Sequence, residues 1–140
     1  MRTFKSILAN REGTSALEFA IIAPLFFLAL FTLVAYGIYL SVAHSVQQIA
    51  ADAARTAVAG LSEAERRNLV DRYLQTAALD GSFLNRRNMT VVVSDDAVNT
   101  DQFTVRISYN SSDLPIWKLF TFALPQQKIE RHSTIRLGGI

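Results

Sequence analysis

The sequence predicts an α+β protein in which one long apolar helix carries a small head domain. Residues 19–43 contain no formally charged residue and are mostly Leu, Ile, Phe, Val and Ala, whereas residues 61–140 hold a helical pattern followed by strand patterns. As a helix, the uncharged run would be roughly 37 Å long, against about 30 Å of bilayer hydrocarbon. We therefore expect a membrane helix over 14–43, a helical stem over 44–60 and an α+β head over 61–140.

The composition limits the function classes that the chain can serve. Its 140 residues include 14 Lys and Arg against 12 Asp and Glu, and the basic residues are scattered instead of forming one stripe. Nucleic-acid binding is therefore not expected. The chain has no cysteine, which excludes disulfides, thiolate metal sites and a cysteine nucleophile.

The charges on either side of the uncharged run predict its orientation. Arg2, Lys5 and Arg11 precede the run and only Glu12 opposes them, whereas the first charged residue after it is Asp52. By the positive-inside rule, the N-terminus lies in the cytoplasm and the head is exported. The sequence thus predicts a single-span protein.

A cleaved secretory signal is the competing interpretation of the same run. Small-residue cleavage patterns occur at 51–53 and 57–59. An apolar core of about 7–15 residues is expected for such a signal, whereas this run extends from residue 19 to residue 43. The Ala-rich stretch that follows also continues a helical pattern, and both features favour a span.

A glutamate, Glu18, directly precedes the uncharged run and follows Gly13 by five residues. An ionised carboxylate at the centre of a span costs roughly 2.5–3.5 kcal/mol on insertion scales, and much less at its end. Taken alone, Glu18 has a plain interpretation as a solvated carboxylate favoured by the positive end of the helix dipole.

The wider setting of Glu18, REGTSALEFA over residues 11–20, resembles a prepilin processing site of the type IV pilin superfamily. The resemblance implies that a prepilin peptidase cuts between Gly13 and Thr14 and removes the basic leader 1–13. It also implies that Glu18, followed by the aromatic Phe19, neutralises the terminal ammonium of a neighbouring subunit and thereby sets the register of assembly.

Further residues along the chain are similar to the TadE-like minor pilins of the tight-adherence (Flp) pilus. They are Pro24-Leu25, Tyr36-Gly37 and the AARTAV segment at 53–58, with a weaker similarity over 114–136. TadF-like and TadG-like proteins share much of this N-terminal pattern. The resemblance implies a minor pilin or pseudopilin of the bacterial inner membrane that helps to initiate, anchor or assemble the pilus. Its expected partners are the prepilin peptidase, other minor pilins, the major pilin and inner-membrane lipid.

Two other function classes stay open at this point. One is an uncleaved, signal-anchored periplasmic binding or sensing module, for which Gly13 would be incidental. The other is a pseudopilin of a related secretion system. We expect neither a nucleic acid nor a small-molecule substrate for the TadE-like interpretation.

Pro24 and the aromatic residues near the end of the run refine the expected membrane helix. A proline inside a helix removes one backbone hydrogen bond, so we expect a mild bend at Pro24, which could also serve helix packing in a bundle. Tyr36, Tyr39 and His44 are expected at the outer membrane interface, where amphipathic aromatic side chains settle.

The stem and the second helix follow from periodic apolar positions. Val46, Ala50, Ala53 and Ala57 form a small-residue seam on which either another helix or the head of the chain itself would pack, and Gly60 is expected to end this helix. The pattern from Ser62 to Glu65 is typical of a capping box. It predicts a second helix over 63–79, stopped by Asp80-Gly81.

Three strand patterns complete the expected head, with period-two alternation over 89–94, 103–109 and 129–137. They predict a three- or four-stranded antiparallel sheet. Its apolar face would be shared by Val91, Val105, Ile107 and Ile135 with Tyr73 and Leu74 of the second helix.

An apolar loop over 114–125 separates the last two strands and carries Trp117, Phe120 and Phe122. Such a run is too apolar to be left in water, because exposed apolar patches usually mark contacts. It either covers the sheet or contacts partner pilins or the membrane surface.

No constellation of residues points to catalysis or to a cofactor. The acidic stretch 95–101 has enough side-chain oxygens to consider Ca²⁺, but it lacks the ligand spacing of an EF-hand and is typical of an Asx-rich turn. His44 is expected at the membrane interface and His132 on a polar strand face, without paired metal ligands or a Ser/His/Asp ordering. We therefore expect no enzyme, no cofactor and no metal site.

Overall fold

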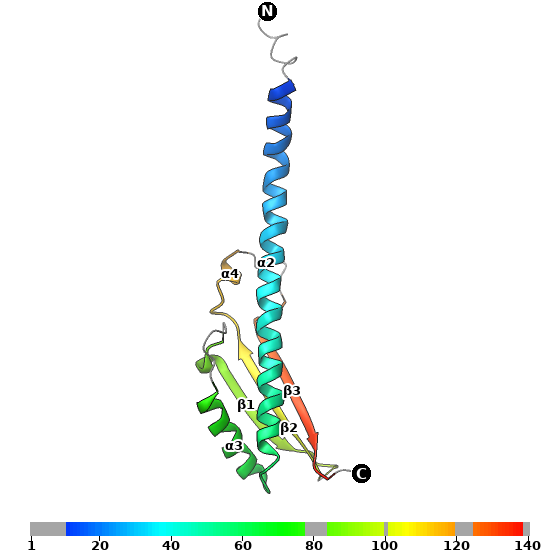
Figure 1. Cartoon of the computed structure of the whole chain (residues 1–140), viewed down its shortest axis with the longest axis vertical. Coiled ribbons are helices and arrows are strands. Elements are labelled where there is room, and N and C mark those ends of the chain that lie inside the picture. The colour runs from blue at the N-terminus through cyan, green and yellow to red at the C-terminus, as the bar shows by residue number, and fades with distance from the viewer. Residues whose placement is uncertain (1–10, 78–83, 100, 120–124, 139–140) are drawn as a thin grey trace, which may run out of the picture.

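The computed structural model describes residues 11–77, 84–99, 101–119 and 125–138. Its helices are α2 (Arg11–Ala57), α3 (Glu63–Thr76) and α4 (Ile116–Leu119), with a 3-10 turn η1 (Arg86–Asn88). Its strands are β1 (Met89–Asp95), β2 (Gln102–Asn110) and β3 (Lys128–Arg136). One half of α2 stands free, and the other half lies with α3 against the sheet (Figure 1). The predicted α+β class is confirmed.

The helix α2 changes its environment along its length. Residues 13–34, the bare half, are exposed apart from partial cover at Ala23 and Thr32. From Ala35 to Ala57, the covered half, buried positions recur along one face. The predicted seam is among them, because Val46, Ala50, Ala53 and Ala57 are each 0% exposed. The seam therefore packs on the head of the same chain.

The three strands form one antiparallel sheet in the order β1-β2-β3. Alternate side chains of β2 point into the core, and Val105 lies opposite Val93 on one side and Ser133 on the other. This period-two burial confirms the predicted alternation. Of the predicted shared face, Val105, Ile107 and Leu74 are buried, while Val91, Ile135 and Tyr73 are partly buried.

The predicted cap of α3 is present with one difference. The Glu65 N–H donates to Ser62 Oγ at 3.3 Å, as expected, but the Glu65 carboxylate accepts from the N–H of Leu61 at 3.0 Å. The helix ends at Thr76 because Ala77 leaves the helical conformation with ψ 117°. The expected end at residue 79 was therefore too late, and the stop signal Asp80-Gly81 lies outside the described residues.

Gly60 has a different role from the predicted helix end. The helix ends at Ala57, and a Cβ on Gly60 would lie 2.8 Å from the backbone nitrogen and Cγ of Arg66. Glycine is thus required for the close approach of the α2–α3 turn to α3.

A buried arginine, Arg66, fastens the same turn to the sheet. Its Nε donates to the carbonyl of Gly60 at 3.1 Å, and its Nη1 donates to Asp95 Oδ1 at 2.5 Å. The guanidinium lies 4.9 Å from the ring centroid of Phe103. Arg66 therefore joins α2, α3 and the strands at the end of the head that lies away from the bare half.

Part of the apolar loop is more regular than expected. Ile116–Leu119 forms a helical turn, and Trp117 is 9% exposed with its Nε1 donating to the carbonyl of Ser111 at 2.5 Å. Trp117 therefore covers the core, which favours the first of the two interpretations for this residue. Phe120 and Phe122 lie outside the described residues.

Candidate functional site: the free end of the long helix

The bare half of α2 has the dimensions of a membrane span. Its residues 13–34 cover roughly 33 Å at 1.5 Å per residue, close to the thickness of bilayer hydrocarbon. Large apolar side chains are exposed throughout, including Leu25 at 69% and Leu33 at 72%. Within the described ranges, α2 is the one helix long and apolar enough to cross a membrane.

The predicted cleavage site lies at the start of this helix. Gly13 and Thr14 are exposed and lie near the first described residue of α2. A Cβ on Gly13 would meet nothing within 4 Å. Packing therefore gives no reason for a glycine here, in contrast to Gly60.

Glu18 is exposed on the same end of the helix, next to Phe19, which is 69% exposed. No ion pair in the described part of the chain involves Glu18. Its exposed carboxylate can therefore be reached by a cation. The predicted cleavage and register residues thus share one accessible end of α2.

The helix surface around Pro24 carries a shallow apolar hollow. The helix runs through Pro24 without interruption. The rings of Phe26 and Phe27 meet edge to face at 5.8 Å, and Phe27 stacks on Phe31 at 6.3 Å. The hollow is lined by Phe19, Ile22, Ala23, Phe26 and Phe27. Such a depression offers a place for a side chain of a neighbouring helix.

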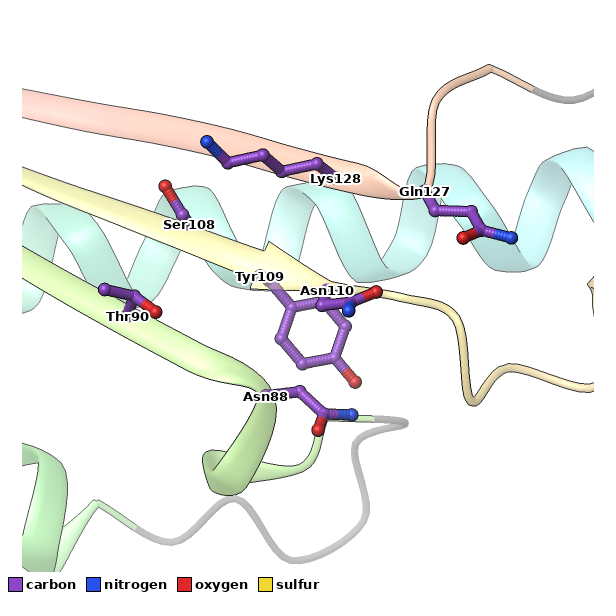
Figure 2. A pocket seen from close by; sticks show the side chains of 7 residues that line it. All are labelled: Asn88, Thr90, Ser108, Tyr109, Asn110, Gln127 and Lys128. Atoms are coloured by element: carbon purple, nitrogen blue, oxygen red, sulfur yellow. The ribbon is translucent and has the colours of Figure 1, made fainter.

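A second, polar hollow lies on the outer face of the sheet (Figure 2). Its lining side chains are already bonded to neighbours: Asn88 Nδ2 donates to Asp113 at 2.7 Å, and Ser108 Oγ donates to Glu130 at 3.3 Å. Lys128 Nζ lies 3.2 Å from the same Glu130 carboxylate. This contact holds the pKa of Glu130 below its ordinary value. None of these contacts joins a nucleophilic side chain to a general base, so they do not indicate a catalytic site in this hollow.

The acidic turn between β1 and β2 organises itself through its own side chains. The Asp96 carboxylate accepts from the N–H groups of Asn99 at 2.9 Å and Val98 at 2.8 Å, and these bonds lower its pKa. Asp95 is paired with Arg66. This arrangement favours the turn interpretation. In the part of the chain that the structure describes, no group of three or more metal-binding side chains occurs.

Three contacts that position the head were missed from the sequence. Arg66 looked like its exposed neighbour Arg67, because both occur in one polar stretch. Gln47 Nε2 donates to the carbonyl of His132 in β3 at 3.2 Å, and the Tyr39 hydroxyl donates to the carbonyl of Gln126 at 3.5 Å. Contacts between residues so distant in sequence leave no local pattern.

Comparison with known proteins gives a match over the N-terminal part of the chain. The family described as TadE-like protein matches residues 13–55, which begin at Gly13 and include the bare half and most of the covered half. No curated protein and no solved structure matches. The chain is thus similar to TadE-like proteins over this stretch, which is less than half of its length. The weaker similarity over 114–136 lies outside the match.

Proposed function

We propose that this chain, TadE-like over residues 13–55, is a minor pilin or pseudopilin of a tight-adherence pilus machinery, held in the bacterial inner membrane with its head exported. The observation that carries this proposal is the bare half of α2. It has the length of a span, it begins with the Gly13 to Glu18 pattern, and its own head does not cover it.

Processing follows from the accessible start of α2. A prepilin peptidase on the cytoplasmic side cuts between Gly13 and Thr14 and removes the leader 1–13. The exposure of Gly13 and Thr14 supports this step, because the peptidase must reach the bond between them. Cleavage leaves a new ammonium group on Thr14.

Assembly uses the charge that cleavage creates. The carboxylate of Glu18, free of ion pairs within the described residues, pairs with the terminal ammonium of a neighbouring pilin. In a low-dielectric medium such a pair is far stronger than in water, so that only one axial register of two helices is favoured. The hollow beside Pro24 then receives side chains of the neighbouring helix.

The test is co-purification of Glu18→Gln with partner minor pilins from membranes. We expect normal insertion and cleavage but recovery of partners reduced by about tenfold or more, since the loss of about 1.4 kcal/mol changes an equilibrium tenfold. Glu63→Gln is the matched control, because Glu63 is an exposed carboxylate at the start of α3 in the head.

Equal recovery of partners by the two variants would contradict the register role of Glu18. That result would instead favour a simple membrane anchor, for which any uncharged residue at position 18 serves as well. A variant that fails to insert would be recognised by its absence from the membrane fraction. Glu18→Asp, which keeps the charge, should retain more of the partners than Glu18→Gln, and equal losses in both would contradict the register role.

A further inference from the structure

The membrane span and the head overlap along α2. The exposed carboxyl group of Glu18, which has no ion pair among the described residues, belongs outside the hydrocarbon, because burying a charge there is costly. About 20 residues are then needed to cross about 30 Å, which places the outer boundary of the hydrocarbon near Ile38. The head already buries α2 from Ala35 onward. The overlap is roughly 5 Å, and any tilt of α2 increases it.

The parts of the head at this level are α4 and the residues just before β3, including Gln126. Figure 1 shows α4 beside α2 at the end of the head nearest the bare half. The Tyr39 hydroxyl donates to the carbonyl of Gln126 at 3.5 Å, which ties the start of the β3 segment to the same level of the helix. The membrane-facing end of the head thus meets α2 near Ile38, at the outer boundary of the hydrocarbon.

The side chains at this end suit the lipid headgroup region. Leu119 of α4 is 50% exposed, and Tyr36 and Leu40 of α2 are exposed at the same level. Lys118 beside Leu119 is also exposed and supplies a cation for lipid phosphates. Aromatic residues and lysine next to aliphatic ones are typical of the membrane interface.

The turn between β1 and β2, with Asp95 and Asp96, lies at the opposite end of the head, away from the bare half. This turn therefore provides a reference position that should stay in water.

We propose that the membrane-facing end of the head, formed by α4 and the 36–40 level of α2, sits in the headgroup region of the outer leaflet and binds phospholipid. This second contact fixes the orientation of the head on the membrane. It rests only on α2 crossing the bilayer and is independent of cleavage and of partner pilins.

The test uses the full chain in nanodiscs of phosphatidylcholine and phosphatidylglycerol, with no other pilin present. Because the chain has no native cysteine, a nitroxide is attached through Leu119→Cys, with Leu33→Cys in the span and Val98→Cys in the distant turn as references. Val98 is 88% exposed and Leu33 is 72% exposed, so that neither substitution disturbs the core. Collisions with oxygen and with a water-soluble nickel chelate report the depth of each label.

We expect the label at Leu119 to lose much of the nickel accessibility that the label at Val98 shows, and to lie shallower than the label at Leu33. Equal nickel accessibility at Leu119 and Val98 would overturn the proposal. Under that result the surface would instead be one for a protein partner.

The single tryptophan gives a second measurement on the unaltered chain. Trp117 lies in α4, so its emission should be quenched more by lipids brominated near the headgroup end of the acyl chains than by lipids brominated near the terminal methyl. Stronger quenching by the lipids brominated near the terminal methyl would also overturn the proposal. Loss of cleavage or of pilin partners in cells would leave both measurements unaffected and would count against the proposed function alone.

Discussion

The bare and covered halves of α2 belong to one continuous helix but follow different packing rules. The bare half exposes bulky side chains such as Leu25 and Phe26, whereas the covered half buries small ones such as Ala50 and Ala53. Lipid chains fill the space around bulky side chains, but a sheet at close range leaves room only for small ones. The size of the apolar side chains therefore separates the part of the helix that holds the head from the part that remains free.

The largest expected difference between the halves comes from enlarging one alanine in each. Ala53→Leu adds three carbons at a position that is 0% exposed, and we expect it to destabilise the head by about 3 kcal/mol through overpacking. Ala20→Leu makes the same change on the exposed surface of the bare half and should leave the head unchanged. Urea unfolding of the detergent-solubilised chain, followed by Trp117 fluorescence, measures both. Equal midpoints would remove the distinction between the halves.

A somewhat smaller effect is expected where Arg66 fastens the end of the covered half. Arg66→Ala removes its bonds to Gly60 and Asp95 and should cost about 2 kcal/mol, because hydrogen bonds to charged groups contribute about 1.5–3 kcal/mol. Asp95 remains partly solvated, which limits the loss.

Arg67→Ala is the control, since its pair with Glu63 is exposed and should contribute less than about 0.5 kcal/mol. The same urea titration compares the two variants. Similar losses for Arg66→Ala and Arg67→Ala would show that Arg66 does not fasten the turn.

Replacing the two glycines Gly13 and Gly60 should have smaller effects, one on cleavage and the other on stability. Gly60→Ala should destabilise the head by about 1 kcal/mol, because the new Cβ would press on the backbone of Arg66. Gly13→Ala meets open space and should leave the unfolding midpoint of the head unchanged while slowing cleavage by the peptidase. Unfolding midpoints and the ratio of cleaved to uncleaved chain on a gel distinguish the two. A stability loss for Gly13→Ala alone would contradict this assignment.

The smallest effect is expected from acid, and only in the head. Hydrogen bonds from Asn99 and Val98 lower the pKa of Asp96, and Lys128 lowers that of Glu130. Such groups add stability above their unfolded pKa of about 4, and this stability is lost as the pH falls through the lower folded values. Both carboxylates are exposed, so the change should be slight, and Glu130→Gln should flatten it in unfolding curves between neutral and acid pH. A steeper acid loss in that variant would contradict the assignment.

The fold followed from local patterns, whereas the boundary between the halves of α2 did not. The seam of Val46, Ala50, Ala53 and Ala57 has helical spacing, and the strands alternate with period two, so both were visible in the sequence. An apolar residue such as Ala35 or Val42 looks the same whether lipid or protein covers it. The position at which the head meets α2 therefore appeared only in the structure.

For the candidate site, too, the sequence showed what depends on neighbouring residues but not what depends on tertiary contacts. Gly13 and Glu18 were found from a short motif, because peptidase recognition and charge pairing depend on neighbouring residues. For Trp117 the sequence left open whether it covers the sheet or contacts partners or the membrane, and its buried bond to Ser111 depends on how the loop closes. Burial of an isolated polar or aromatic side chain is a tertiary property, so the sequence did not indicate the burial of Arg66 and left that of Trp117 open.

The central claim is that the bare half of α2 is a processed assembly helix, and the intact mass of the membrane-bound chain tests it most directly. The protein is extracted from cells that contain the prepilin peptidase and from cells that lack it. We predict a chain that begins at Thr14 in the first case and one that retains the leader 1–13 in the second. A mass that starts at Met1 in both would contradict the claim.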